Sequence, residues 1–388
     1  MIDYNKLLSK KIQQVKPSGI RRFFDIAEEL SDCVSLGVGE PDFVTPWHIR
    51  RAGIRSLEEG HTHYTSNWGL MSLREAISEY LKRRFDMTYC AKNEIVVTVG
   101  GSEAIDMCIR AVVDNGDEVL IPEPSFVCYS PITSLSGGVP VALPTYEKDN
   151  FKLTAETLKK AITEKTKLLV LPFPNNPTGA VMEKEDLEKI AEVIRDKDIL
   201  VLSDEIYAEL TYKGKHTSIS CIEGMWEKTI VVSGFSKAFA MTGWRLGYAC
   251  GPREIIEQMT KAHQYAIMSA PTTAQYAAIE AMRNSDDDIE YMKNEYDMRR
   301  RYLVNALRQI GMDCFEPLGA FYVFPSIKKF GLSSEEFCER LIRQERCAVI
   351  PGNAFGELGE GFVRLSYAYS LENLKKAVER IEKFIKTL

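Results

Sequence analysis

The 388-residue sequence predicts an α/β protein, with a mainly parallel sheet sandwiched by helices in a large domain and a smaller α+β domain. Between residues 94 and 232, short apolar runs alternate with segments of helical periodicity, as in a parallel sheet covered by helices on both faces. After residue 251 the periodicity is mainly helical, and short strand-like runs return towards the C-terminus. A hydrophobic content of 45% with 27% charged residues is ordinary for a chain that is long enough for two domains.

Residues 1–47 are expected to form an N-terminal arm and part of the small domain. A polar arm leads into a segment of helical spacing at 20–30. A short strand near 34–36 then meets a glycine-rich turn, where a backbone can approach a ligand closely. Pro46 opens a helix that continues to about residue 59, because a proline in the first turn loses no helical hydrogen bond.

The large domain is expected over residues 48–288. Its predicted strands are 94–99, 118–121, 139–143, 167–171, 199–202 and 229–232, and its predicted helices include 72–85, 104–113, 157–162 and 184–195. Ligands of such sheets bind beyond the carboxyl ends of the strands. The candidate side chains at those ends are Ser102, Phe126, Asn176, Asp204, Tyr207 and Lys237.

The small domain is expected over residues 289–388. A long helix near 286–310 should lead into it, and its predicted strands are 315–324, 347–350 and 361–366. Ser370 is expected to cap a terminal helix. The apolar stripe of that helix predicts packing against the core rather than a membrane anchor.

Composition excludes several classes of function. The net charge of −6 comes without a long run of Lys or Arg, which favours a small-molecule partner over nucleic acid. The nine cysteines show no CxxC pair or metal-like spacing, so we expect no metal and a reducing compartment, the cytoplasm. Neither a signal-like N-terminus nor an apolar run of about 18 residues is present, so no membrane partner is expected.

Lys237 stands in an unusual position for a lysine. It follows a β-branched apolar run and lies among Gly, Ser, Ala, Phe, Met and Trp residues, with Arg245 eight positions later. Desolvation in such surroundings lowers the pKa of an ammonium group and frees the amine as a nucleophile, which suits a Schiff base. The alternative is a surface lysine on a turn between two strands.

The segment Gly100-Gly101-Ser102 is a candidate anion site. A tight glycine turn joins a buried strand to the start of a helix, whose free N–H groups and dipole favour a phosphate. The pattern is neither G-x-G-x-x-G nor a Walker sequence, so dinucleotide or ATP binding is not expected. The alternative is that Ser102 only caps its own helix.

Four motifs carry a resemblance to a known family. They are Asn-Asn-Pro-Thr-Gly at 175–179, Ser-Asp-Glu-Ile-Tyr at 203–207, Ser236-Lys237 with Arg245, and Phe-Val-Arg-Leu-Ser at 362–366. In order and spacing they resemble the class I aminotransferases, which are fold-type I pyridoxal-phosphate enzymes. The similarity runs from about residue 10 to the end. It is nearest to the prokaryotic branch with aspartate, aromatic-amino-acid and N-acetyl-diaminopimelate aminotransferases, and it specifies the substrate only weakly.

The resemblance implies roles at the cofactor ring. Lys237 would form the Schiff base with pyridoxal 5'-phosphate and then shuttle the proton during transamination. Asp204 would pair with the pyridinium nitrogen, and the alternative is an ordinary helix N-cap. Tyr207 and Asn176 would hydrogen-bond the phenolic oxygen of the cofactor. Phe126 would stack on the ring, and its alternative is one more core aromatic.

The resemblance also implies a phosphate site. The backbone of Gly101 and Ser102, the Ser236 hydroxyl and the Arg245 guanidinium would hold the phosphate. Ser233 is an alternative to Ser236. Tyr64 stands where the family places a tyrosine that reaches the phosphate of the neighbouring subunit, so we expect a homodimer with shared active sites.

Arg364 would clamp the substrate α-carboxylate, with Gly39 and Asn176 lining the same pocket. The expected reaction moves an amino group from aspartate, an aromatic amino acid or a related donor to a 2-oxo acid, with 2-oxoglutarate as the expected acceptor. A second carboxylate needs a cation, for which the candidates are Arg21, Arg22 and Arg110; each has an alternative as a solvated helix residue.

Two other functions remain open from the sequence. A pyridoxal-phosphate-dependent C–S β-lyase on the same fold would use the same Lys237, Asp204 and Arg364. A non-catalytic, cofactor-binding regulatory domain is the remote alternative. The expected absence of a DNA-binding module, with only about fifteen residues before the domain, argues against it.

Overall fold

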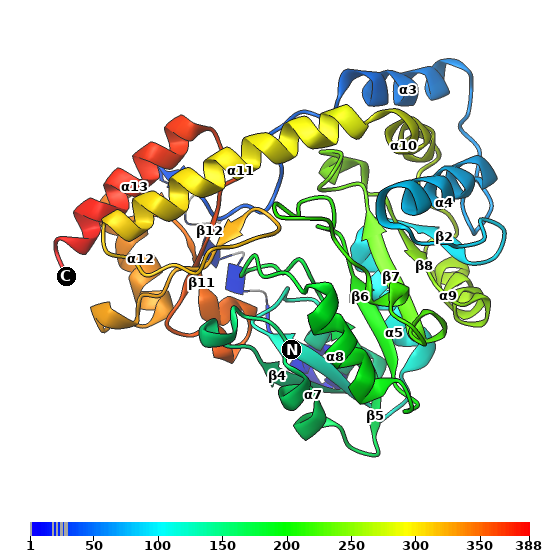
Figure 1. Ribbon diagram of the computed structural model, residues 1–388, viewed down its shortest axis with the longest axis horizontal. Coiled ribbons are helices and arrows are strands. Elements are labelled where there is room, and N and C mark those ends of the chain that lie inside the picture. The colour runs from blue at the N-terminus through cyan, green and yellow to red at the C-terminus, as the bar shows by residue number, and fades with distance from the viewer. Residues whose placement is uncertain (1, 18, 21, 24–25, 27–29) are drawn as a thin grey trace.

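A seven-stranded sheet forms the centre of the larger part of the molecule (Figure 1). The structure is a computed structural model and describes residues 2–17, 19–20, 22–23, 26 and 30–388. In the order in which they pair, the strands are β2 (Ile95–Thr98), β8 (Gly247–Cys250), β7 (Thr229–Gly234), β6 (Leu200–Asp204), β5 (Thr166–Leu171), β3 (Glu118–Glu123) and β4 (Val139–Pro144). Only β8 runs antiparallel to its neighbours, which confirms the predicted, mainly parallel sheet.

Helices cover both faces of this sheet (Figure 1). They are α4 (Met71–Phe85), α5 (Gly100–Val112), α6 (Tyr129–Ser136), α7 (Ala155–Ala161), α8 (Lys184–Ile194), α9 (Arg253–Ala266) and α10 (Thr272–Asn284). The inner strands are mainly apolar because both of their faces are buried, whereas the edge strand β4 is partly exposed. On β5, Leu168 and Val170 share a core with α5 and α9, whereas Leu169 and Leu171 share one with α8. Alternate residues of one strand thus stabilise opposite layers.

A single long helix, α11 (Asp286–Gln309), runs from the large sheet to the smaller part of the molecule, as predicted (Figure 1). The smaller part contains β1 (Val34–Ser35), β9 (Tyr322–Val323), β10 (Cys347–Ala348), β11 (Ile350–Pro351), β12 (Val363–Ser366), α12 (Ser334–Glu345) and α13 (Leu371–Ile385). β1 pairs with β10 in parallel, and β12 lies between β11 and β9 in an antiparallel sheet. The strand predicted at 315–324 is limited to two residues, because Ala320 adopts a left-handed φ of 57° that interrupts an extended chain.

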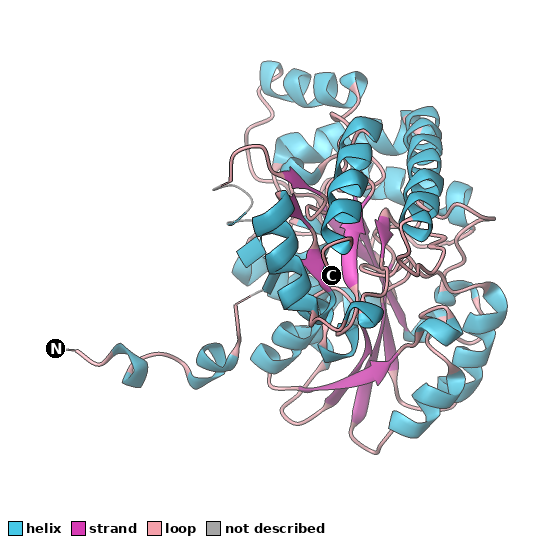
Figure 2. Cartoon of the chain, turned by 90° about the vertical axis from the view of Figure 1, so that its left-hand side faces the viewer, coloured by secondary structure: helices cyan, strands magenta, loops and turns pink. Residues whose placement is uncertain are grey.

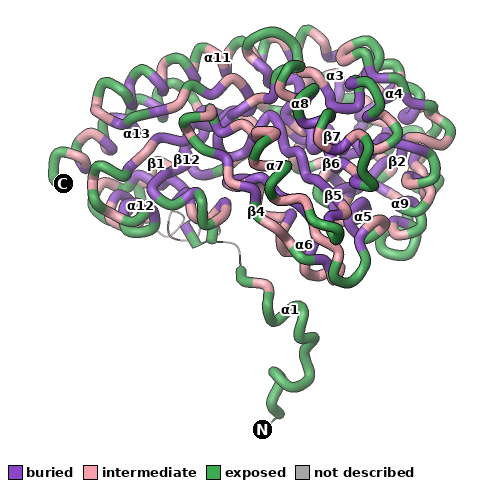
Figure 3. The backbone as a smooth tube through the Cα atoms, turned by 60° about the horizontal axis from the view of Figure 1, so that its bottom comes forward, coloured by how far each residue is buried: buried purple, intermediate pink, exposed green. Residues whose placement is uncertain are grey.

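The N-terminal residues project from the body of the molecule (Figure 2). They include η1 (Tyr4–Lys6) and α1 (Lys10–Gln14), which are almost entirely exposed (Figure 3). The helix predicted at 20–30 lies largely outside the described residues. The next helix, α3 (Trp47–Glu58), follows Pro46 directly, close to the predicted start.

The predicted cap of the terminal helix is present, because Ser370 Oγ accepts a hydrogen bond of 3.3 Å from the Asn373 N–H. The remaining 3₁₀ helices are η2 (Glu147–Asp149), η3 (Ile219–Cys221), η4 (Trp226–Lys228), η5 (Thr242–Trp244), η6 (Lys328–Phe330), η7 (Gly352–Phe355) and η8 (Glu357–Gly359). Among the residues that the structure describes, no helix combines the length and apolarity needed to cross a membrane.

Candidate active site

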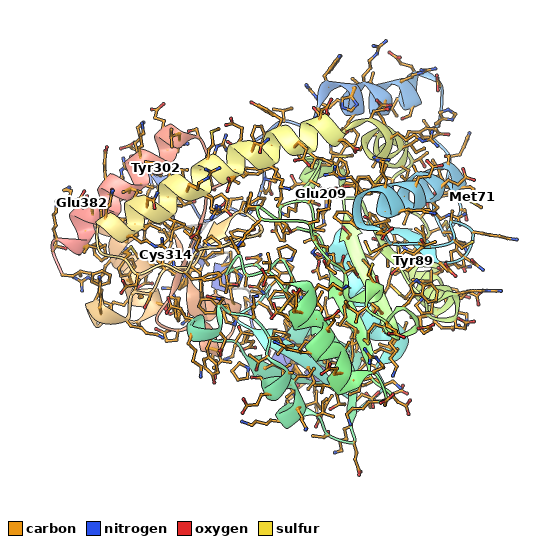
Figure 4. All side chains as sticks on the ribbon, in the orientation of Figure 1. Met71, Tyr89, Glu209, Tyr302, Cys314 and Glu382 are labelled. Atoms are coloured by element: carbon orange, nitrogen blue, oxygen red, sulfur yellow. The ribbon has the colours of Figure 1, made fainter. Side chains whose placement is uncertain are left out.

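A cavity of about 340 Å³ lies where the carboxyl ends of the central strands meet the smaller part of the molecule. All of the residues predicted for the cofactor ring, the phosphate and the α-carboxylate line it except Tyr64 and the alternative Ser233: Gly39, Gly101, Ser102, Phe126, Asn176, Asp204, Tyr207, Ser236, Lys237, Arg245 and Arg364. Residues that are far apart in the sequence, such as Ser102, Asn176 and Lys237, converge here because the parallel strands end at one edge of the sheet, whereas Arg364 comes from β12 of the smaller part. The buried Glu209 (Figure 4) is a structural charge outside this cavity. Its carboxylate accepts hydrogen bonds from Tyr80 and Arg84 on α4, and none of the three residues lines the cavity.

Lys237 follows the end of β7 and points into the cavity. Its Nζ donates a hydrogen bond of 2.6 Å to the Gly39 carbonyl, and the rings of Tyr207 and Phe321 lie within 6 Å of it. The pKa of the Lys237 ammonium is lowered from 10.5 to about 8, mainly by burial, and the neighbouring Arg364 contributes to the decrease. The structure therefore does not support the alternative of a solvated surface lysine.

Asp204 ends β6 and is buried. Its Oδ2 accepts a hydrogen bond of 2.7 Å from the Tyr129 hydroxyl, and its Oδ1 accepts one of 3.2 Å from the Ile206 N–H. Burial raises the pKa of this carboxyl, while the two hydrogen bonds oppose the rise. No helix begins here, since residues 206–209 form turns, so Asp204 is not a helix N-cap.

Tyr129 lines the cavity although the sequence analysis did not single it out. It lies three residues after Phe126, and the two rings meet edge to face at 6.2 Å. This i, i+3 spacing at the start of a helix was the signal that could have found it. Tyr129 therefore packs against Phe126 and also hydrogen-bonds to Asp204.

Tyr322 on β9 is the second lining residue that the sequence analysis missed. Its hydroxyl lies 2.8 Å from that of Tyr207, and its ring lies 4.5 Å from the guanidinium of Arg364. A Cβ at position 39 would come within 2.2 Å of the Tyr322 hydroxyl, so the predicted close approach of backbone at Gly39 is required by this packing. A tyrosine in a predicted strand is common in protein cores, so the sequence around Tyr322 does not indicate a site residue.

Arg364 on β12 is a buried cation that faces the cavity. Its Nη1 donates to Asn176 Oδ1 at 2.9 Å and its Nη2 donates to the Gly37 carbonyl. Its Nε is buried and has no hydrogen-bond partner, and no carboxylate pairs with it within the described part of the chain. A buried charge without a counter-ion is costly, so the site is suited to an anionic ligand.

A second anion site lies at the start of α5. Val99 precedes the helix and makes no side-chain cap, and Ser102 does not cap it either. The first-turn N–H groups have no intrahelical partners and are available to a ligand. Gly100 has a φ of 77°, and the Arg245 guanidinium lies 3.0 Å from where its Cβ would stand. The Arg245 Nη1 donates to the Thr242 carbonyl at 3.0 Å, and no acid pairs with it among the described residues.

The two serine alternatives are distinguished by position. Ser236 is buried and lines the cavity, whereas the Ser233 hydroxyl donates to the Glu205 carbonyl at 3.4 Å and does not line it. Together with Lys237, Arg245 and Arg364, the cavity thus holds three cations against the two acids Asp204 and Glu40. This donor set fits a phosphorylated, carbonyl-bearing cofactor with a carboxylate substrate.

Three predicted residues lie elsewhere. Tyr64 is 82% exposed on a loop outside the cavity. Arg22 pairs with Glu339, and Arg110 pairs with Asp106 at 2.8 Å on an exposed side of α5, so neither faces the cavity. Arg21 lies outside the described residues. The described part of the cavity therefore contains no fourth cation for a second carboxylate.

Comparison with known proteins identifies the class. Residues 31–381 match the family described as Aminotransferase class I and II, and the chain belongs to this family of pyridoxal-phosphate-dependent aminotransferases. The predicted fold, enzyme class and cofactor are thereby confirmed.

Several relatives share almost the whole chain. An aspartate aminotransferase of Pyrococcus abyssi is 47% identical, with 98% of each chain covered. The crystal structure of an aromatic aminotransferase from Pyrococcus horikoshii is 46% identical, with a TM-score of 0.90 over 94% of this chain and 99% of the other. The structure of an aspartate aminotransferase from Thermus thermophilus with maleate is 40% identical, with a TM-score of 0.93 over 97% and 99%.

Proposed function

We propose that this aminotransferase transfers the α-amino group of an aspartate-like, aromatic or related amino acid to 2-oxoglutarate. The observation that carries the proposal is the position of Arg364, a buried and unpaired guanidinium in the same cavity as Lys237. An α-carboxylate bound by Arg364 brings the substrate amine and Cα into the cavity with the Lys237 amine.

The other residues of the cavity would act on the cofactor ring and on the substrate Cα. The bound cofactor supplies an electron sink for the negative charge that develops on the substrate Cα. Lys237 would hold the cofactor and move the Cα proton, because its lowered pKa of about 8 makes the free amine much more abundant near neutral pH than it is for an ordinary lysine. Asp204 would keep the proton on the ring nitrogen, Tyr207 and Asn176 would bind the phenolic oxygen, and Phe126 would cover one face of the ring.

The phosphate would be held by the N–H groups of Gly101 and Ser102, the Ser236 hydroxyl and the Arg245 guanidinium. These groups combine a helix N-terminus with a cation, the arrangement that favours a dianion. These groups and Arg364 line the same cavity, so the phosphate and the substrate carboxylate would be bound by different residues.

The partner that we propose is a second copy of this chain, with Tyr64 of the partner subunit completing the phosphate site. Tyr64 is 82% exposed, and its loop is tied to a neighbouring segment by Asn67, whose amide donates to the Met268 carbonyl at 2.8 Å. That segment exposes Tyr265, Ile267 and Met268. An exposed apolar surface of this kind is typical of an interface between subunits.

Donor preference follows from the charges of the cavity. Its three cations are already used by the cofactor and the α-carboxylate, and Ile20, Val38 and Ile105 contribute apolar lining. We therefore propose that at least one neutral or aromatic donor is accepted as well as a dicarboxylic one. The distal carboxylate of a dicarboxylic substrate would then be held by polar groups or by the partner subunit.

The test is a half-reaction screen. The holoenzyme is mixed with each amino acid in turn, and the loss of the visible absorbance band of the bound cofactor is followed; 2-oxoglutarate should restore the band. A C–S β-lyase, which would use the same residues, instead releases pyruvate from a cysteine conjugate without added oxo acid. Pyruvate release without any donor half-reaction would replace the proposal with the lyase.

Two further proposals concern organisation. We propose the division into an arm with part of the small domain at 1–47, the cofactor-binding domain at 48–288 and the small domain at 289–388. The large sheet lies within the second range, and α11 begins at its end. We also propose a cytoplasmic location, which is supported by the free state of all nine cysteines.

A further inference from the structure

A buried histidine and a carboxylate meet behind the phosphate-binding end of α5. His263 belongs to the last turn of α9 and is fully buried. Its Nδ1 lies 2.7 Å from Oε1 of Glu103. Because a carboxylate oxygen only accepts, Nδ1 carries the hydrogen of this bond. The other ring nitrogen, Nε2, is buried and has no hydrogen-bond partner in the described structure.

The Glu103 carboxylate also reaches backwards along the chain. Its Oε2 accepts the N–H of Val99, the residue at which β2 has ended and α5 has not yet begun. One carboxylate therefore connects α9 to the junction between strand and helix. Neither Glu103 nor His263 lines the cavity, and the sequence analysis assigned no role to either.

The junction controls where the phosphate donors lie. The N–H groups of Gly101 and Ser102 follow Val99 by only two and three residues, and no side chain at the cap position fixes this turn. Two intervening glycines give the backbone conformational freedom. A charge-assisted hydrogen bond in a buried setting is strong and directional, so the Glu103 carboxylate restricts that freedom.

We propose that His263 and Glu103 are positioning residues for the cofactor phosphate. His263 holds the Glu103 carboxylate, and Glu103 holds Val99, so that the first-turn N–H groups of α5 are fixed before the phosphate arrives. The inference rests on the proposed function of this turn as the phosphate site. It assigns His263 no contact with the cofactor.

Two substitutions of His263 separate this role from general packing. His263→Asn keeps an N–H donor near the position of Nδ1, and it loses only Nε2, which has no partner. His263→Gln carries its amide farther out, towards the position of Nε2. The dissociation constants of the apoprotein for pyridoxal phosphate and for pyridoxal, which lacks the phosphate, are measured for each variant by fluorescence titration.

We expect His263→Asn to bind pyridoxal phosphate as the wild type does. His263→Gln should bind it roughly tenfold more weakly, which is the typical effect of losing one buried hydrogen bond to a charged group. Binding of pyridoxal should be unchanged in both variants. His48→Gln is the matched control, because His48 also hydrogen-bonds to carboxylates, but its partners Glu280 and Asp288 lie on α10 and α11 and not at the start of α5.

The proposal is overturned if the Asn and Gln variants bind pyridoxal phosphate equally well, or if pyridoxal affinity falls in parallel. Arg245→Gln tests the underlying phosphate site separately. If that variant binds pyridoxal phosphate like the wild type, the assignment of the phosphate site fails whatever the His263 variants do.

Discussion

The Tyr129 hydroxyl donates a 2.7 Å hydrogen bond to Oδ2 of Asp204, and both side chains are buried. A phenol that points at a carboxylate stabilises its charged form, against the burial that raises the pKa of Asp204. The proposed role of Asp204, holding a proton on the ring nitrogen, requires that charged form. The hydrogen bond therefore helps to keep Asp204 ionised in an apolar site.

The first prediction follows from this pair. Tyr129→Phe removes the bond and raises the pKa of Asp204, so the acid limb of the kcat profile should move to higher pH. At neutral pH kcat should fall by about tenfold, the typical effect of a hydrogen bond to a charged group. Tyr296→Phe is the control, because the Tyr296 hydroxyl is buried without a hydrogen-bond partner among the described residues. An unshifted acid limb in Tyr129→Phe would refute the coupling.

The second prediction concerns Lys237. Lys237→Ala should give a folded protein without transamination, because the amine contributes chemistry rather than packing. Borohydride treatment of the wild-type holoenzyme should fix the cofactor to the peptide that contains Lys237, as read by mass spectrometry. Recovery of the cofactor on a different lysine would show that the assignment is wrong.

The third prediction tests the shared site. Lys237→Ala, which we expect to be inactive, and Tyr64→Ala, which we expect to be severely impaired, are mixed and allowed to exchange subunits. Each heterodimer then has one intact site, so activity should return to about a quarter of the wild-type value at equal mixing. A mixture of Lys237→Ala with Asp204→Ala is the control, since both defects lie in the same subunit's site. Equal recovery in the two mixtures, or none in either despite proven exchange, would exclude the role of Tyr64.

The fourth prediction is a pH dependence of the apoprotein. The pKa of Lys237 is lowered to about 8 in the folded chain, so between about pH 8 and 10.5 the unfolded chain binds a proton that the folded chain does not. Stability therefore rises with pH in this window, by about 3 kcal/mol in total relative to Lys237→Met, and the difference is constant below pH 8. Urea denaturation of the two apoproteins from pH 7 to 10.5 measures it. A constant difference over the whole range would mean that the Lys237 pKa is normal.

Much of the site was predictable because many of its residues lie at the carboxyl ends of parallel strands, which meet at one edge of the sheet. Residues such as Asn176, Asp204 and Lys237 follow apolar runs, and parallel strands bring those ends together without any knowledge of side-chain contacts. The sheet was predictable for the same reason, since its strands are continuous apolar runs. β8 was harder to predict, because four residues after a loop carry too little periodicity to indicate direction.

The missed residues depend on tertiary contacts. Tyr322 reaches the site only because the small sheet packs against the large one, and its local sequence resembles any core strand. The role of His263 depends on the packing of α9 against α5. Of the two interpretations of Arg110, the structure supports the solvated helix residue, because Arg110 pairs with Asp106, one turn earlier, on an exposed side of α5.

The pairing of β1 with β10 has a consequence for biosynthesis. Val34 is in register with Cys347, so one strand of this small sheet leaves the ribosome long before its partner has been translated. At ordinary rates of elongation the delay is roughly 15 to 60 s. All seven strands of the large sheet are synthesised within that interval. During that interval β1 has no β10 to pair with, so this small sheet completes only after the strands of the large sheet have been translated.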